Sequence, residues 1–407
     1  MEKRTHITLI GLNFFPESTA IGLYSTQLAQ YLEAQGMQLD VITAFPYYPQ
    51  WKIASDYQNK PSYLKEELGD INIYRYKQYV PANPTFFKRI LYILSFTWGS
   101  FWNLWKIKEC DIVISVVPFT SATLLGYIQK RRFKAKSWIH IQDFEFDAAF
   151  QSGLTKRGEE KGGFIYKCLM QIEKSLFSRA DKVSTISHTM IKKLKRKTTA
   201  PTYFLPNWID EKQIDPAFAK AHTYLNTSKF KILYSGNIGD KQDWEFFVKF
   251  IEKIDFEYFE IIIVGDGSKR LWLEKQIASY PSISLYPPVA YEELSDLLCS
   301  ADVHILFQKP EVIDTVMPSK ILGMMASAKP SIITGHAQSE VATAIATSQG
   351  GFYSSEKEVN TVVEQLKKLF DQPELAKEMG EKARTYVVSN FSKDQILNSF
   401  LEQLSQL

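Results

Sequence analysis

Cysteine is scarce in this sequence, and its spacing does not indicate a metal site. Only three cysteines, Cys110, Cys168 and Cys299, occur among 407 residues, and no two of them form a CxxC pair. This excludes a disulfide framework and the common zinc-ligand patterns. We therefore expect a reducing compartment, the cytoplasm. The first apolar run meets Asn13 and Pro16 too early for the core of a signal peptide, so we expect no export signal.

An excess of charge of one sign is also missing. Lys and Arg number 48 against 45 for Asp and Glu, which leaves a formal net charge of +3. This balance excludes a general nucleic-acid-binding protein. Hydrophobic residues make up 45% and charged residues 23%, which excludes a disordered chain and a membrane protein of many spans. At roughly 150 residues per domain, the length accommodates two or three domains.

Short apolar runs rich in β-branched residues recur along the chain and predict buried parallel strands. They are ITLIGL (7–12), LDVIT (39–43), DIVISVV (111–117), KVSTI (182–186), KILYSG (231–236), EIIIVG (260–265), DVHILF (302–307) and PSIIT (330–334). Helical stretches, such as 22–36 and 291–300, separate most of these runs. The alternation predicts an α/β fold with doubly wound sheets.

The alternation restarts after residues 204–218, where Pro206 and Pro216 interrupt the periodicity. This interruption predicts a domain boundary near residue 206. Residues 356–407 have helical periodicity and no strand candidate, so they predict two or three terminal helices. The predicted parts are a first domain over 1–205, a second over 206–385 and a C-terminal helix over 386–407.

The most aromatic stretch of the chain is residues 86–108. Its uncharged part, residues 90–105, contains Trp98, Trp102 and Trp105, but it is shorter than the ~20 residues that span a bilayer. Basic residues flank it on both sides, as in a helix that lies in the membrane interface with its rings at headgroup depth. A buried core helix explains the pattern equally well.

Four loops follow strand candidates, the position at which open parallel sheets bind ligands. The first, residues 11–29, brings Gly22 to a helix start, where backbone N–H groups attract an anion and glycine lets a phosphate come close. Alone this signal is weak, because glycine is common at helix starts. The third, residues 264–270, has Arg270 where the dinucleotide fingerprint requires a glycine, and we interpret it as a tight turn.

The second loop, residues 234–244, is better suited to a diphosphate. Gly236 precedes Asn237, and Lys241 and Gln242 follow shortly afterwards. A cation and an amide beside a glycine loop favour a phosphorylated ligand.

The fourth loop, residues 314–330, contains the most informative basic residue. Pro318 suits the first helical position, so Ser319 and Lys320 fall at a helix start, where amides, a hydroxyl and an ammonium converge. A lysine at a helix N-terminus opposes the helix dipole. We therefore interpret Lys320 as an anion ligand, the alternative being an ordinary surface lysine.

Acidic residues alternate in IHIQDFEFDAAF (139–150). Asp143, Glu145 and Asp147 would point to the same side of an extended chain, whereas we expect His140 to be a satisfied core histidine. No second cluster at ligand spacing accompanies the three carboxylates, so we expect no bound metal.

These stretches together resemble the family 4 glycosyltransferases of the GT-B fold along the whole chain. The residues that carry the resemblance are NFFPESTAIGLYSTQLAQYLEAQG, VITAFPYYPQW (41–51), IQDFEFDAAF, LPNWID, GNIGDKQ and MPSKILGMMAS. They are most similar to a subgroup of fucosyltransferases and fucosamine transferases of colanic acid, capsule and lipopolysaccharide O-antigen synthesis. The segments YYPQW and PSK are the most specific of these motifs for the subgroup.

The resemblance implies two Rossmann-like domains facing across a cleft, with C-terminal helices crossing back to the first domain. It implies that the C-terminal domain binds a nucleotide-sugar and that the N-terminal domain binds the acceptor. Transfer in the family retains the anomeric configuration and needs no metal. Backbone amides and cations stabilise the leaving diphosphate, a role that falls here to Lys320.

The sequence also departs from the wider family. Asn237 and Gln242 replace an Arg and a Lys, and Thr315 and Gly323 stand about where the wider family has two glutamates. Contacts inferred from those glutamates therefore do not carry over.

The subgroup pattern GNxGxxQ with PSK does match, and it implies Asn237, Gln242, Ser319 and Lys320 around the diphosphate and Asp314 near the donor sugar. Gly22 and Gly236, from the two glycine-containing loops, complete the ligand-binding candidates. Asp143 and Glu145, from the alternating acidic residues, are the catalytic candidates beside Lys320. Asp143 matches the acidic member of a His-Asp pair, with Gln142 in the histidine place, and its role as base or acceptor anchor stays open.

The resulting hypothesis is a cytoplasmic, membrane-peripheral, retaining glycosyltransferase without cofactor or metal. It moves a sugar, such as fucose from GDP-fucose, to a polyprenyl-diphosphate-linked saccharide. The alternatives are a transferase of a UDP-linked amino sugar, a non-hydrolysing sugar-nucleotide epimerase and a non-catalytic membrane-associated binding protein. A nicotinamide-dependent oxidoreductase is disfavoured because no GxGxxG follows a strand candidate.

Overall fold

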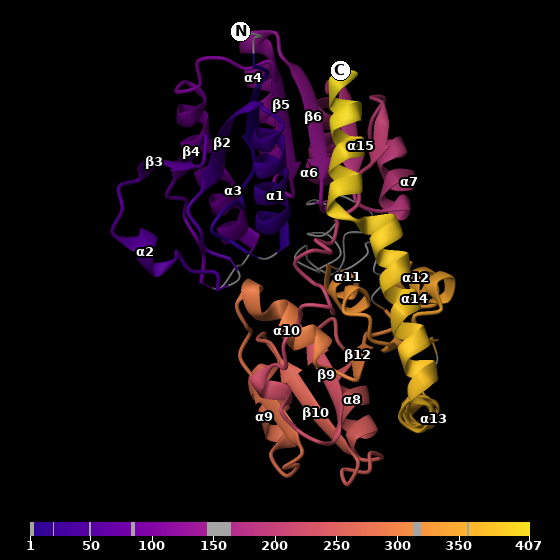
Figure 1. Cartoon of the computed structure of the whole chain (residues 1–407). Helices are drawn as coiled ribbons and strands as arrows, with labels where there is room; N and C mark the ends of the chain where they lie inside the picture. Colours follow the sequence, from indigo (N-terminus) through magenta and orange to yellow (C-terminus); the bar gives the residue numbers. More distant parts are fainter. Residues whose placement is uncertain are drawn as a thin grey trace. The chain divides into compact units, whose positions relative to one another are not determined.

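The computed structural model describes residues 4–18, 20–48, 50–82, 86–144, 164–311, 319–355 and 358–407. The chain divides into two compact units (Figure 1). Unit 1 runs to Pro206 and includes Leu397–Leu407, and unit 2 is Asn207–Ile396. From the sequence, the boundary between the two domains was predicted at residue 206, and the return of the chain to the first domain was predicted at residue 386.

Unit 1 is built on an eight-stranded sheet of order β3-β4-β2-β1-β5-β6-β7-β8. All its pairings are parallel except that of β3 with β4. The strands are β1 (His6–Ile10), β2 (Gln38–Ala44), β3 (Tyr63–Leu68), β4 (Ile71–Tyr76), β5 (Ile112–Val117), β6 (Lys136–Ile141), β7 (Lys182–Thr185) and β8 (Thr202–Phe204).

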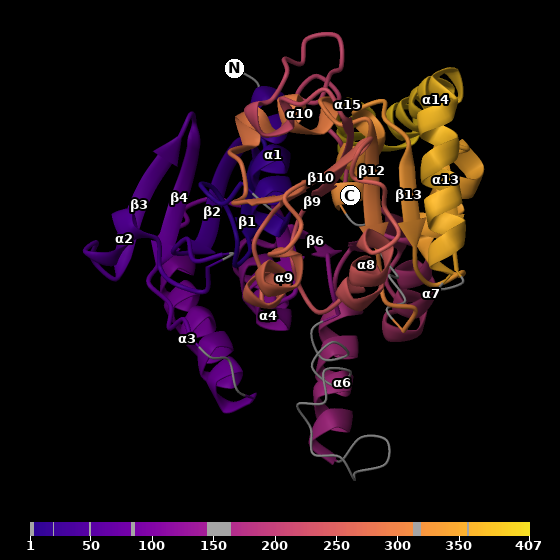
Figure 2. The same cartoon turned by 90° about the horizontal axis from the view of Figure 1, so that it is seen from below.

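Helices cover both faces of this sheet. They are α1 (Ala20–Ala34), α2 (Ser55–Gln58), α3 (Phe86–Leu104), α4 (Thr120–Phe133), α6 (Phe164–Phe177) and α7 (His188–Lys197). Figure 2 shows α3, α4 and α6 in a row on one face and α1 on the other. Tyr92 and Phe96 of α3 pack with Ile42 and Val113 of the strands in the core beneath that row.

Unit 2 has a six-stranded, wholly parallel sheet of order β11-β10-β9-β12-β13-β14. Its strands are β9 (Phe230–Ser235), β10 (Phe259–Val264), β11 (Ile283–Tyr286), β12 (Val303–Phe307), β13 (Ser331–Thr334) and β14 (Gly351–Ser354). Its helices are η1 (Thr223–Leu225), α8 (Trp244–Ile251), α9 (Arg270–Ile277), η2 (Tyr291–Glu293), α10 (Leu294–Cys299), α11 (Ser319–Ala326), α12 (Glu340–Ser348), α13 (Val359–Asp371) and α14 (Pro373–Phe391). The doubly wound α/β prediction is confirmed.

The C-terminal segment is not the single helix predicted over 386–407. α14 ends at Phe391, Ser392 has an extended backbone with ψ 133, and α15 (Lys393–Ser405) follows. Residue 386 therefore lies inside α14. Phe400 of α15 is fully buried, with its ring centre 4.7 Å from that of Trp138 on β6, so the last residues are part of the unit 1 core.

Each sheet changes its winding direction at one place. In unit 1 the chain proceeds from β1 to one side and resumes at β5 on the other, and in unit 2 the same reversal separates β9 from β12. Crevices outside the carboxyl ends of strands at such switch points are where doubly wound sheets bind ligands. The loops after β1, β5, β9 and β12 are therefore the positions at which this fold is expected to bind ligands.

Candidate active site

The loop after β9 lies directly against the loop after β10. The Ile238 N–H donates to the Asp266 carbonyl at 2.8 Å, and the Lys269 N–H donates to the Ile238 carbonyl at 2.9 Å. A Cβ built on Gly265 would stand only 1.9 Å from the Gly236 carbonyl oxygen. Glycine is thus required at Gly265 for the two backbones to approach each other.

Arg270 closes the second of these loops. Its guanidinium donates to the Gly265 carbonyl and, at 3.2 Å, to the Tyr286 carbonyl. It therefore satisfies backbone acceptors of the protein itself, in agreement with the interpretation of residues 264–270 as a tight turn.

Lys320 extends from the start of α11 to the loop after β9. Its Nζ lies 5.5 Å from the ring centre of Tyr234, and its Cδ would be 3.4 Å from a Cβ on Gly236. Ser319, the first residue of α11, is exposed. A glycine loop, a cation and a helix N-terminus therefore meet at the switch point of unit 2, an arrangement suited to binding a diphosphate.

The loop after β9 is supported from below by polar side chains. Tyr234 donates its hydroxyl to the Asn237 carbonyl at 2.6 Å, and burial raises the pKa of Tyr234, which keeps the hydroxyl a donor. The Oε1 of Gln242 accepts the Gly239 N–H at 3.1 Å, and Gln242 is buried. Asn237 is exposed. Of the two predicted amide ligands, Gln242 therefore supports the loop and Asn237 faces solvent.

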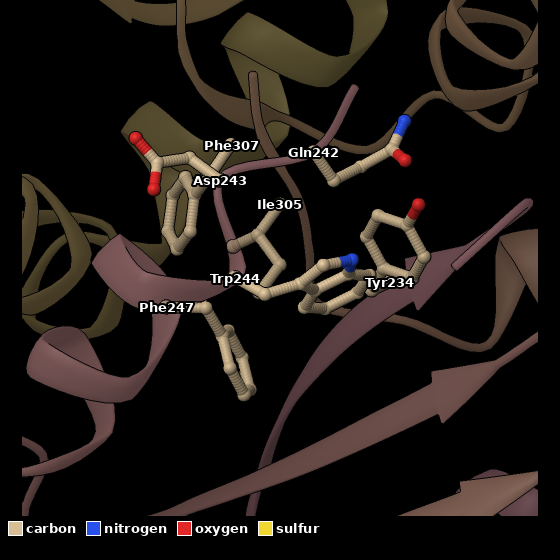
Figure 3. A pocket seen from close by; sticks show the side chains of 7 residues that line it. All are labelled: Tyr234, Gln242, Asp243, Trp244, Phe247, Ile305 and Phe307. Atoms are coloured by element: carbon tan, nitrogen blue, oxygen red, sulfur yellow. The ribbon is translucent and has the colours of Figure 1, made fainter. Parts of the chain in front are cut away.

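A small cavity lies beneath this loop (Figure 3). Its lining residues are Tyr234, Gln242, Asp243, Trp244, Phe247, Ile305 and Phe307. Its volume of about 10 Å³ accommodates at most one water molecule. Trp244 Nε1 donates to the Gly239 carbonyl at 3.1 Å, so this region is the packed base of the loop and has no room for a nucleotide.

Unit 1 contains the predicted acidic residue Asp143, which is exposed just after β6. Its neighbour Gln142 is buried and contacts His140 through Nε2 atoms 2.9 Å apart, while His140 Nδ1 lies 2.9 Å from Ser184 Oγ. Burial lowers the pKa of His140 to about 3. His140 is thus the satisfied core histidine that the sequence predicts, and it orients Gln142.

Gly22 in the first turn of α1 also has a packing reason. A Cβ there would stand 2.7 Å from the Cβ of Glu17 and 2.8 Å from its carbonyl oxygen. The glycine admits the Glu17 loop against the helix, and its phosphate-binding role stays a prediction. Glu145 and Asp314 lie outside the described residues.

Glu17, which the sequence alone did not indicate, is a buried carboxylate at the unit 1 switch point that accepts several hydrogen bonds. Glu17 is 7% exposed and accepts the backbone N–H groups of Tyr47 and Tyr48, each at 2.9 Å. The available signal was an acidic residue beside Pro16 in a loop between a strand and a helix.

The segment predicted at 86–108 is α3 together with its C-terminal extension. Tyr92 and Phe96 are buried, as a core helix requires. The other face exposes a stripe of apolar side chains at helical spacing, which we call the α3 stripe. Its members are Phe87, Ile90, Leu91, Leu94, Trp98, Trp102 and Trp105. The two interpretations of this segment therefore describe opposite faces of one helix.

Within the described ranges, no helix combines the length and apolarity needed to cross a bilayer. In the same part of the chain, no three His, Cys, Asp or Glu side chains are grouped so as to hold a metal ion. The absence of a metal requirement stays a prediction.

Comparison with known proteins places the chain in a family. Residues 19–208 match the model described as "Glycosyl transferase 4-like domain", and residues 229–372 match "Glycosyl transferases group 1". The chain is 33% identical to the putative colanic acid biosynthesis glycosyl transferase WcaI of Escherichia coli, across 98% of this chain and 99% of that protein.

Solved structures share the fold at low identity. Sucrose-phosphate synthase of Thermosynechococcus elongatus aligns with a TM-score of 0.73 and 15% identity over 99% of both chains. Anabaena HepE in complex with UDP and glucose aligns with a TM-score of 0.68 and 11% identity over 98% of this chain and 99% of that one.

The fold is thus that of the GT-B glycosyltransferases, and the resemblance of the sequence to them is confirmed. The chain belongs to the family 4 glycosyltransferases.

Proposed function

We propose that this glycosyltransferase moves fucose from GDP-fucose to a polyprenyl-diphosphate-linked saccharide, with retention and without a metal, in exopolysaccharide synthesis of the colanic acid type. The name of the E. coli relative supports the pathway. The placement of Lys320 beside Gly236 at the unit 2 switch point supports the donor site. Unit 2 binds the nucleotide-sugar, and unit 1 binds the acceptor.

Lys320 stabilises the charge that develops on the leaving diphosphate. Its ammonium and the N-terminal amides of α11 are in place before reaction, so they stabilise that charge without reorganisation. We expect Lys320→Ala to lower kcat by at least about tenfold. Lys275→Ala, at an exposed position of α9, is the matched control. Wild-type kinetics in Lys320→Ala would refute this role.

Retention is tested by the anomeric configuration of the product, and metal independence is tested by turnover in the presence of a chelator. The anomeric coupling in the NMR spectrum of the product should equal that of the donor. Turnover should persist in excess chelator. An inverted product or chelator-sensitive turnover would contradict the corresponding part of the proposal.

The α3 stripe supports a membrane-bound acceptor. Phe87 is 76% and Trp98 63% exposed, and such large apolar side chains are costly to hydrate. A shallow, open depression at the edge of the stripe is lined by Tyr63, Trp102 and Lys106, with Lys106 Nζ 4.9 Å from the Tyr63 ring centre. A cation beside apolar rings suits the headgroup region of an anionic membrane. The enzyme thus works at the inner face of the plasma membrane.

Vesicle sedimentation tests this surface. Replacing Trp98, Trp102 and Trp105 with Ser should release the protein from vesicles that contain anionic lipid. Phe218→Ser is the control, because Phe218 is 83% exposed in unit 2. Equal binding of the triple variant and the wild type would exclude the α3 stripe as the membrane contact.

The donor nucleotide is tested by thermal shift with UDP, GDP, dTDP and CMP in excess chelator. A ligand at ~100 times its Kd adds about 2.7 kcal/mol of stability. Stabilisation by GDP alone supports fucose. Stabilisation by UDP, the nucleotide bound in HepE, supports a UDP-linked amino sugar instead. Conversion of the nucleotide-sugar without acceptor would indicate an epimerase.

A further inference from the structure

Two loops meet at the switch point of unit 1 and are joined by one carboxylate. Glu17 lies in the loop after β1, and residues 45–52 follow β2. Oε1 of Glu17 accepts the N–H groups of Tyr47 and Tyr48 at 2.9 Å, and Oε2 accepts the Asn13 side-chain amide at 2.8 Å. Burial raises the pKa of Glu17, and these donors oppose that shift. The carboxylate therefore fixes the second loop to the first.

A second set of buried polar groups reinforces these loops. Arg75 on β4 is fully buried and donates to the Phe15 carbonyl and, at 3.1 Å, to the Ala44 carbonyl. The Gln78 amide pairs with Phe45 in both directions, at 2.9 and 3.1 Å. Buried polar groups stabilise a fold only when all are satisfied. Their concentration at the carboxyl edge of the sheet indicates loops that must hold one conformation.

The fixed loop also contacts α3 through aromatic rings. The Tyr92 ring centre of α3 lies 5.6 Å from that of Tyr47 and 6.0 Å from that of Trp51. On its other side Tyr92 lies 5.0 Å from Phe119, which follows β5. Trp51 has a left-handed backbone, with φ 53, a conformation that a bulky residue adopts only when its surroundings enforce it. The inner face of α3 thus packs on the loop, while its outer face is the α3 stripe.

We propose that Glu17 is a positioning residue for the lipid-linked acceptor. It holds residues 45–48 and 50–52 so that the half-buried rings of Tyr48 and Trp51 form a surface for the acceptor saccharide. Sugars present C–H faces that pack on aromatic rings, and the tyrosine hydroxyl adds a polar contact. This inference rests on the proposed function, because the substrate it positions is the lipid-linked saccharide.

The test separates acceptor kinetics from donor kinetics. In Glu17→Gln the carboxylate becomes a neutral amide, so the hydrogen bonds from the Tyr47 and Tyr48 N–H groups lose the charge that strengthens them. We expect the acceptor KM to rise at least about tenfold, with the nucleotide-sugar KM within about twofold of wild type. Wild-type values for both substrates would overturn the inference, as would an equal rise in both.

The control variant is Asp181→Asn. Asp181 also accepts a backbone N–H, that of Ser137 at 2.7 Å, together with Lys130 Nζ at 2.7 Å. It lies just before β7, at the amino edge of the same sheet, so its loss should lower the thermal midpoint and leave the acceptor KM unchanged. An acceptor KM raised equally in Asp181→Asn would show that general loosening of unit 1 is responsible, and it would overturn the inference.

A second variant covers the case in which Glu17→Gln does not fold. Tyr48→Ala removes one ring of the proposed surface and leaves the Glu17 hydrogen bonds, which involve its backbone. A raised acceptor KM in this variant supports the inference, and an unchanged one overturns it. Failure of the wild type itself to glycosylate a polyprenyl-diphosphate saccharide would instead refute the proposed function.

Discussion

The close approach of the loops after β9 and β10 makes a quantitative prediction for Gly265→Ala. The new Cβ would lie 1.9 Å from the Gly236 carbonyl oxygen, so the loop after β9 must move by roughly 1 Å. Neither a turn nor a left-handed φ is lost, because Gly265 has no positive φ. Overpacking of this kind costs about 1–3 kcal/mol of stability.

A displacement of roughly 1 Å at a binding loop also lowers affinity. We expect the Kd of the donor nucleotide to rise about 10- to 100-fold, equivalent to about 1.4–2.8 kcal/mol. Isothermal titration calorimetry measures this Kd, and differential scanning fluorimetry measures the thermal midpoint. Both should change in Gly265→Ala.

Gly380→Ala is the matched control. A Cβ on Gly380 would lie 2.0 Å from the Ala328 carbonyl oxygen, an equally severe clash within unit 2, between α14 and the turn that follows α11. It should lower the thermal midpoint by a similar amount and leave the nucleotide Kd unchanged. An unaltered Kd in Gly265→Ala, or a Kd equally weakened in Gly380→Ala, would refute a donor site at the loop after β9.

Three further predictions concern stability. Phe400→Ala should cost about 3–5 kcal/mol by leaving a cavity against Trp138, measurable as a lower midpoint in urea. Gly99→Ala should destabilise by about 1–3 kcal/mol, because its Cβ would lie 2.0 Å from the Tyr76 ring; a wild-type midpoint would contradict this packing. Burial lowers the pKa of His304 to about 3, so the unfolded chain takes up the proton first and stability falls with pH from about 6.5 towards 3. This loss of unfolding free energy reaches about 2 kcal/mol at pH 5. Urea titrations at pH 7 and pH 5 measure the unfolding free energy, and the fall between these two pH values should be smaller by this amount in His304→Asn.

The eight strands named from apolar runs are all present, within two residues at either end. The four edge strands, β3, β8, β11 and β14, were missed. An edge strand is covered on fewer sides and therefore lacks a continuous apolar run: β3 alternates exposed and half-buried residues, and β14 is half-buried throughout. The interior strand β4 was also absent from the prediction, because Arg75 interrupts its apolar run. The interior strand β6 was expected only as a strand candidate without bounds before Asp143, because His140 interrupts its apolar run.

The candidate site was predictable where chemistry follows from local sequence. Lys320 was identified because a cation at a helix start opposes the dipole, and the structure places it beside Gly236. Gln242 shows the limit of this reasoning, since its carbonyl oxygen is occupied by the Gly239 N–H. Glu17 was missed because the backbone N–H groups that it accepts lie about thirty residues away in sequence, and no local pattern indicates them.

The sequence by itself determined the α/β class, the interior strands of continuous apolar run and the membership of the family 4 glycosyltransferases, because these depend on periodicity and on contiguous motifs. Tertiary structure alone decided which side chains form hydrogen bonds that support the loops and which face solvent. It gave α3 a buried face and an exposed apolar face, where the sequence left two interpretations open. It also joined Glu17 to Tyr47 and Tyr48. The physical reason is that burial and hydrogen bonding at a switch point depend on strands that are neighbours in space and distant in sequence.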